Sequence, residues 1–300
     1  MKQGYKFLVK NLPFVLIGAL LSTAIGVIAM KLGYNATTSW LQMTGVCTIL
    51  FILAILGTIG FTIYMTVKMP KIHLARIKKS CAFLRIASVV AFMMIFFMFA
   101  LETRKLILAS YQDQLPAYFS TWRILKYVFA LPASLHFLFM AIPSKTKRGK
   151  RIKMPKVLSY ISSLGVLFWC VFGLLSAYTY ERMGFTNILK IWQIIVYLTY
   201  IVFFLFETKF DLLNDGKGSS KWFIFTGCIA FITSLSISLT TTICMIFRII
   251  PAESTLTFSA TEIFTSFTIG LYAFSKIYAF VRRSRQGRCP LPFGRFVRHR

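Results

Sequence analysis

Acidic side chains are scarce in this sequence: the 300 residues include 8 Asp and Glu, against 35 Lys and Arg. Charged residues of both signs make up 14% of the chain, well below the roughly 25% of a soluble globular domain. Apolar residues make up 57% and come in long blocks separated by short charged segments. This composition excludes an ordinary soluble domain and favours a membrane protein.

Catalytic signatures are also missing. The chain has no HExxH, GxSxG or P-loop, and no pair of carboxylates inside an apolar block, which hydrolytic chemistry would need. The six cysteines form no CxxC and no metal-like spacing with histidine, and four of them lie inside apolar blocks. We therefore expect a protein that is not an enzyme and that has no cofactor, metal site or disulfide framework.

The apolar blocks predict an all-α, polytopic integral membrane protein. A helix needs about 20 mainly apolar residues to cross a hydrocarbon core of about 30 Å, and the blocks lack the alternation of a transmembrane β-barrel. We predict eight spans, near residues 12–30, 39–67, 83–101, 124–143, 157–179, 189–207, 222–249 and 259–281. Residues 1–281 are then one helical bundle, and 282–300 form a basic, disordered cytoplasmic tail.

The distribution of Lys and Arg predicts the orientation. Counted on alternating sides of eight spans, every segment of one side is at least as basic as any segment of the other. Because cytoplasmic loops collect Lys and Arg, both termini are predicted to be cytoplasmic and the protein to lie in the cell membrane as a multi-pass protein.

The most basic segment, SKTKRGKRIKMPK at 144–156, has seven Lys or Arg in thirteen positions and joins spans four and five. We interpret it as a topology anchor that also contacts anionic lipid headgroups, at about 1 kcal/mol per basic residue. No aromatic interleaving accompanies the charge, so we expect no nucleic-acid binding. The central anchors are Lys147, Arg148, Lys150, Arg151 and Lys153.

Span seven is rich in hydroxyl side chains. Ser234, Ser238 and Thr242 share one helix face at intervals of four residues. Such hydroxyls either bond to their own or neighbouring helices or form the polar wall of a cavity. With His136 and Glu262 they make up the candidate polar binding site.

Ionisable residues inside a span are functional candidates. His136 is the deepest of them, and no buried carboxylate is expected beside it, so a proton relay would be incomplete. Lys276 lies close enough to the cytoplasmic end of span eight to extend into the headgroup region. Glu262 is expected to pair with Arg248 or Lys126 near the outer surface.

Three functions remain open. The first is a non-catalytic membrane sensor or accessory subunit, which passes a change sensed by the helices to the basic loops and to a membrane-protein partner. The alternative is a small-molecule transporter with its polar site on spans seven and eight. The third, a lipid-modifying enzyme, would act at the cytoplasmic interface near Glu207 and Asp211.

Overall fold

The structure is a computed structural model that describes residues 2–35, 40–41, 45–69, 81–111, 121–142, 155–179, 188–212, 216–249 and 260–286. Within these residues, eight helices are long and apolar enough to cross a membrane. The predicted number of spans is therefore confirmed. The basic anchors from Lys147 to Lys153 and the tail beyond residue 286 lie outside the described residues.

The helices follow the chain in a simple order. Seven spans are single helices, and the remaining one consists of α7, a π-helical turn η1, and α8. Their bounds are α1 (Lys2–Gly33), α2 (Val46–Lys68), α3 (Ala82–Tyr111), α4 (Thr121–Ala141), α5 (Lys156–Thr179), α6 (Ile188–Leu212), α7 (Gly216–Ser234), η1 (Leu235–Leu239), α8 (Thr240–Ile246) and α9 (Ala260–Gln286).

Several helix boundaries differ from the prediction, among them those of the second, seventh and eighth spans. The second span begins at Val46 because Gly45 is extended at its N-terminus, and β1 (Tyr34–Asn35) pairs with β2 (Trp40–Leu41) before it. The seventh span ends at Ile246, and Arg248 follows with a left-handed φ of 54°, a conformation common just after a helix end. The last helix continues to Gln286, so the first residues of the predicted tail are helical.

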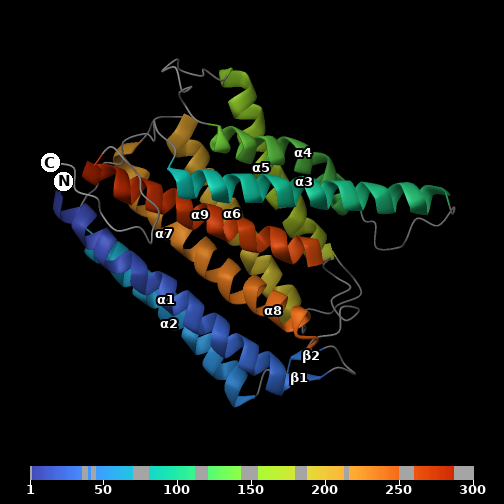
Figure 1. The fold of residues 1–300 in the computed structure, drawn as a ribbon, viewed down its shortest axis with the longest axis horizontal. Coiled ribbons are helices and arrows are strands. Elements are labelled where there is room, and N and C mark those ends of the chain that lie inside the picture. The colour runs from blue at the N-terminus through green and yellow to red at the C-terminus, as the bar shows by residue number, and fades with distance from the viewer. Residues whose placement is uncertain are drawn as a thin grey trace.

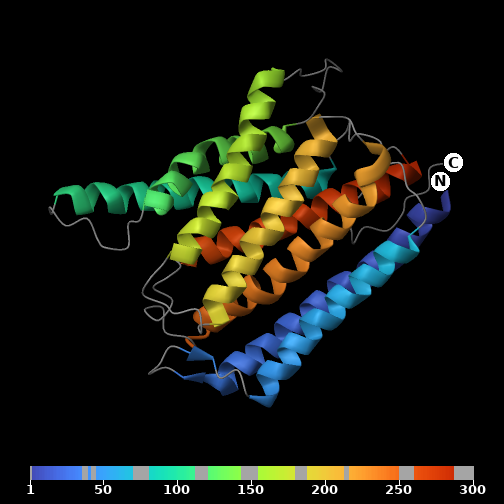
Figure 2. The ribbon, with the colours of Figure 1, turned by 180° about the vertical axis from the view of Figure 1, so that it is seen from behind.

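Two groups of helices make up the molecule. The hairpin of α1 and α2 lies along one side of the group formed by α3 to α9 (Figures 1 and 2). Of the 18-residue apolar stretch in each helix, 72% is buried in α9 and 17% in α2. Helix α9 therefore lies at the centre of the molecule and α2 at its edge. The first turn of α1 and the last turn of α9 lie at the same end of the molecule, as an even number of spans requires (Figure 1).

The hairpin is held by close contacts of small residues on α1. A Cβ added at Gly18 would lie 2.8 Å from Cγ2 of Thr58 on α2, and one at Gly26 would lie 2.6 Å from the ring of Phe51. The same Cβ on Gly26 would lie 2.8 Å from Oγ1 of Thr240 on α8. Glycines at these positions let the helix backbones approach closely.

The π-helical turn lies where the hairpin meets the bundle. The hydroxyl of Thr23 on α1 donates to the carbonyl of Leu235 at 3.3 Å, and the hydroxyl of Thr240 donates to the carbonyl of Thr23 at the same distance. A π-turn disrupts the regular i→i−4 ladder. The hydroxyl of Thr23, whose shorter bond goes to the carbonyl of Ala19 at 2.9 Å, lies beside this point of disruption.

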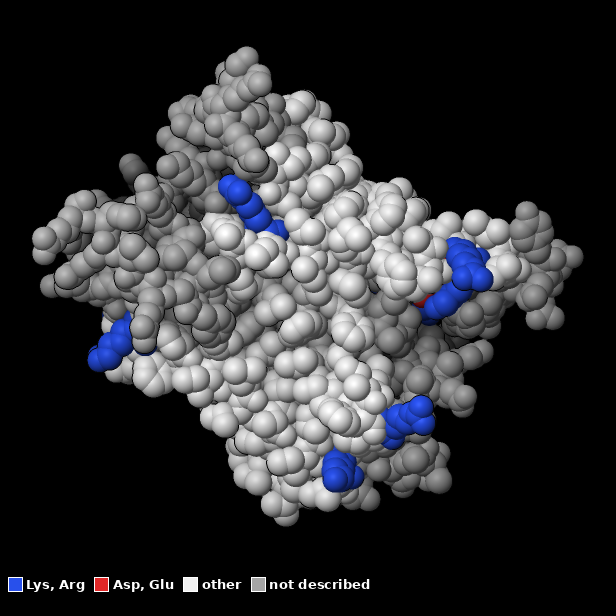
Figure 3. Space-filling view, in the orientation of Figure 1, with Lys and Arg blue, Asp and Glu red and all other residues white. Residues whose placement is uncertain are grey.

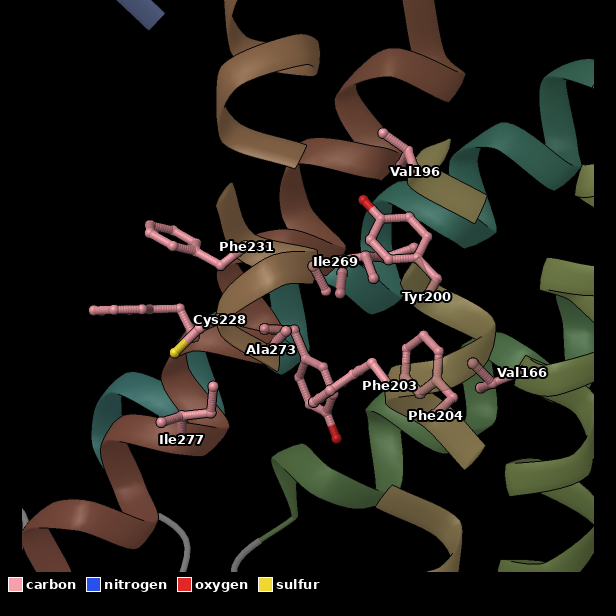
Figure 4. Packing of buried hydrophobic residues seen from close by; sticks show 14 of the residues in the cluster. Val166, Val196, Tyr200, Phe203, Phe204, Cys228, Phe231, Ile269, Ala273 and Ile277 are labelled. Carbon is pink, nitrogen blue, oxygen red and sulfur yellow. The ribbon is translucent and has the colours of Figure 1, made fainter. Parts of the chain in front are cut away.

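Aromatic side chains fill the space between α6, α7 and α9. Figure 4 shows Phe203 and Phe204 of α6 facing side chains of α7 and α9. Phe231 of α7 stacks on Phe274 of α9 with ring centroids 4.4 Å apart. On the face drawn in Figure 3, the described Lys and Arg side chains are few and scattered. Many large hydrophobic side chains are exposed, among them Phe14, Leu53 and Phe97, as expected of a surface that faces lipid.

Candidate functional site

Helix α4 carries three basic side chains, each facing an acidic side chain on a different helix. All six residues are buried. The partners are Glu102 on α3, Glu262 on α9 and Glu207 on α6, and these are all the acidic residues whose side chains the structure describes. The three pairs are Arg123 Nη2–Glu102 Oε2 at 3.7 Å, Lys126 Nζ–Glu262 Oε1 at 2.5 Å and His136 Nε2–Glu207 Oε1 at 3.7 Å.

The inner cluster consists of Glu207, Lys276, Tyr272, His136 and Ser163. The ammonium of Lys276 and the hydroxyl of Tyr272, the latter at 2.5 Å, both donate to Oε1 of the Glu207 carboxylate. The imidazole of His136 lies 3.5 Å from the Tyr272 hydroxyl and 3.4 Å from the Ser163 hydroxyl. Buried charges are tolerated in a membrane interior when they are paired in this way.

Two expectations from the sequence are wrong here. His136 does have a buried carboxylate beside it, and Lys276 is 1% exposed and holds Glu207 instead of extending to the headgroups. Both errors have one cause, since the contacts depend on how α4, α6 and α9 pack against one another. This packing places the carboxylate of Glu207 beside both His136 and Lys276.

A second cluster, called the outer cluster below, consists of Lys126, Glu262, Tyr197 and Trp169. The predicted pairing of Lys126 with Glu262 is confirmed. The ammonium of Lys126 lies 5.3 Å from the ring centre of Tyr197 and 6.0 Å from that of Trp169, distances at which cations are attracted to aromatic faces. Glu262 lies in the first turn of α9, where the helix dipole favours a negative charge. Arg248, the other predicted partner, lies exposed in the turn after α8.

Helices α4 and α9 are parallel and in register. Lys126 contacts Glu262, His136 contacts Tyr272, and Met140 Sδ lies 3.7 Å from Lys276 Nζ, each pair being separated by 136 residues. A constant separation requires two helices that run in the same direction. The contacts cover 14 residues of each helix, which corresponds to about 21 Å of rise and most of a hydrocarbon core.

The hydroxyl of Ser234 lies in a packed helix contact. It donates to the carbonyl of Ala230 at 2.5 Å, and its oxygen lies 2.5 Å from the hydroxyl of Tyr200 on α6. A Cβ added at Gly270 on α9 would lie 2.4 Å from Cβ of Ser234. The helices therefore touch at this point, and the hydroxyl is satisfied by protein groups.

The five residues of the predicted polar site do not form one site in the structure. His136 belongs to the inner cluster, Glu262 to the outer cluster, and Ser234 to the contact with α6 and α9. Ser238 in η1 and Thr242 in α8 are both 5% exposed, and the Thr242 hydroxyl is buried without a hydrogen-bond partner.

The structure adds Glu207, Lys276 and Tyr272 to the surroundings of His136. The sequence signal that points to the first two is their charge inside a helix. Tyr272 has no such signal, since tyrosines occur throughout the chain.

Eight apolar helices with internally paired charges define the class of this chain, which is that of multi-pass membrane proteins. Within the described residues, no group of three or more His, Cys, Asp or Glu side chains is placed to hold a metal ion. Comparison with models of protein families, with curated proteins and with solved structures found no match. The functional argument therefore rests on the residues of this chain.

Proposed function

We propose that this chain is a non-catalytic membrane sensor or accessory subunit in which α4 transmits the signal. The observation that carries the proposal is the set of three buried contacts between basic side chains of α4 and carboxylates on α3, α6 and α9. A displacement of α4 would disturb all three contacts together. Networks of buried polar groups favour discrete arrangements over continuous ones, and discrete arrangements are what a switch requires.

The position of α4 in the chain supports this role. Its last helical residue, Ala141, is followed within three residues by the basic segment 144–156, which is predicted to be cytoplasmic. A movement of α4 in the membrane would therefore move this segment relative to lipid headgroups or to a partner protein. In the proposed sensor, the basic segment passes the movement of α4 to lipid headgroups or to a partner protein.

The hydroxyl face of α7, η1 and α8 favours a sensor over a transporter. Ser234 is fully buried, and its hydroxyl is bonded within the helix contacts. Eight residues of the span from Lys221 to Ile246 that carry hydroxyls are less than a tenth exposed: Thr226, Thr233, Ser234, Ser236, Ser238, Thr240, Thr241 and Thr242. Packing of this kind is expected where hydroxyls connect helices.

Thiol labelling tests the proposal. In a variant without native cysteines, Ser234→Cys and Ser238→Cys are expected to stay unlabelled by a small membrane-impermeant thiol reagent, because packed helices exclude water. The measurement is made on intact cells and on inside-out vesicles. Phe247→Cys, at a side chain that is 71% exposed beyond the end of α8, is the positive control.

Labelling of both mid-span cysteines would contradict the sensor proposal and favour the second candidate, a small-molecule transporter. One observation supports that candidate, namely the His136–Glu207 pair beside Lys276, since carboxylate and imidazole groups form proton relays in transporters. The lipid-modifying enzyme receives less support, because Glu207 is buried and bound by Lys276 and Tyr272. The side chain of Asp211 lies outside the described residues.

A further inference from the structure

The imidazole of His136 is buried but loosely held. Its Nδ1 lies 3.4 Å from the Ser163 hydroxyl, and its Nε2 lies 3.5 Å from the Tyr272 hydroxyl and 3.7 Å from Oε1 of Glu207. Well-formed hydrogen bonds of this type measure roughly 2.7–3.2 Å. All three contacts are longer, so neither ring nitrogen has a strong partner in this arrangement.

The carboxylate of Glu207, beside His136, has one oxygen that accepts no hydrogen bond. Lys276 and Tyr272 donate to Oε1 of Glu207, whereas Oε2 is buried without a hydrogen-bond partner. A carboxylate with one unsatisfied oxygen can accept a further donor. A neutral imidazole offers one N–H and an imidazolium offers two.

We propose that His136 is a proton-binding site and that its protonation decides whether His136 or Lys276 is paired with the carboxylate of Glu207. The proton is transferred from hydronium in the surrounding water to the ring nitrogen that carries none: one N–H bond forms, one O–H bond of hydronium breaks, and a water molecule is left. The imidazolium then donates to the free oxygen of Glu207 and draws α4 towards α6. The proposal deepens the sensor function and rests on it, since it names the proton as the stimulus and α4 as the responding helix.

The charge balance of the cluster requires a second movement. The groups that face His136 are Ser163 on α5, Glu207 on α6, Tyr272 and Lys276 on α9, and the rings of Phe137 and Phe204. With a neutral imidazole, Glu207 and Lys276 cancel each other. With an imidazolium the cluster has one excess positive charge, which is unfavourable in a membrane interior.

Release of Lys276 removes this excess. Lys276 lies four residues before Phe280, the end of the apolar part of α9, a rise of about 6 Å. The long stem of a lysine can span such a distance and place its ammonium among headgroups.

The first measurement is NMR of His136 in the full chain in lipid nanodiscs. The chain has three histidines, and replacing two of them with His73→Gln and His299→Gln leaves His136 as the one histidine in the spectrum. We expect the ¹⁵N spectrum to change from that of a neutral ring to that of an imidazolium on acidification. A ring that remains neutral at about pH 5 overturns the proposal.

The second measurement follows the release of Lys276. Met140→Cys, in a background without native cysteines, places a thiol beside Lys276. Its reaction with an impermeant thiol reagent is normalised to that of Ile142→Cys, at the residue that follows α4, which corrects for the general pH dependence of thiol reactivity. We expect a several-fold rise of this ratio on acidification, and no rise when His136→Gln or Glu207→Gln is added.

Each other outcome decides against the proposal. A rise that persists with His136→Gln assigns the pH response to another group, and a protonated His136 without any rise shows that Lys276 stays on Glu207. His136→Phe, which keeps a ring between Phe137 and Phe204, is the second variant if His136→Gln does not fold. Labelling of Ser234→Cys and Ser238→Cys tests the sensor function separately. Failure of the proton-binding proposal can therefore be distinguished from failure of the sensor proposal.

Discussion

Lys276→Met is expected to destabilise the protein by about 3–5 kcal/mol, because removing one partner of a buried ion pair leaves the other charge buried without compensation. The remaining charge is the carboxylate of Glu207, which is 1% exposed and would then face the imidazole of His136 at 3.7 Å and the hydroxyl of Tyr272. Thermal unfolding in nanodiscs, followed by circular dichroism, measures the loss.

Two companion variants make this result interpretable. Adding Glu207→Gln to Lys276→Met removes both charges and is expected to restore most of the lost stability, since a neutral pair of similar volume replaces a buried ion pair at little cost. Lys105→Met is the matched control, because the Lys105 side chain is 49% exposed where it meets Glu102. Glu102 still faces Arg123 when Lys105 is replaced, and an ion pair whose cation is solvated contributes at most about 1 kcal/mol. Equal effects of Lys276→Met and Lys105→Met would show that the inner pair is not a structural ion pair.

Gly270→Ala is expected to destabilise the bundle by about 1–3 kcal/mol through overpacking. The added methyl group would lie 2.4 Å from Cβ of Ser234 and 2.9 Å from its hydroxyl oxygen. Because Cβ of Ser234 is fixed by the backbone of α7, the clash can be relieved only by separating α7 from α9. The unfolding temperature measures the effect, and the bond between the Tyr200 hydroxyl and the carbonyl of Ser266 should weaken with it.

Gly57→Ala is the matched control for this substitution. Gly57 is helical like Gly270, but a Cβ added there meets no atom within 4 Å. Alanine is favoured over glycine in a helix by roughly 1 kcal/mol, so Gly57→Ala is expected to be neutral or slightly stabilising. If Gly270→Ala behaves in the same way, α9 and α7 do not pack as closely as the structure has them.

These predictions separate two roles of the buried polar residues. Ser234 and Gly270 fix the distance between α7 and α9, and their substitution should change stability alone. Lys276 and Glu207 stabilise the bundle and, on the proposed mechanism, also exchange partners with His136. The inner cluster is therefore expected to link stability to protonation, whereas the contact at Ser234 is expected to be insensitive to pH.

The sequence by itself determined the class of the protein and the number of its spans. Long apolar blocks specify transmembrane helices because length and hydrophobicity are local properties of the chain. The predicted pairing of Glu262 with Lys126 followed from their positions near the same predicted end of two spans.

Only the tertiary structure decided which polar residues meet. The contacts of Glu207 with His136 and Lys276 join α6 to α4 and α9, over separations of 71 and 69 residues. They depend on how far each helix extends and how it is rotated about its axis, and neither property is encoded in the local hydrophobicity of a span. The hydroxyls of Ser234 and Thr242 share a face by spacing alone, but the π-turn between them and the contact of Ser234 with Gly270 give them different surroundings. The physical reason is that a span is specified by its own residues, whereas a site inside a bundle is specified by the packing of several helices against one another.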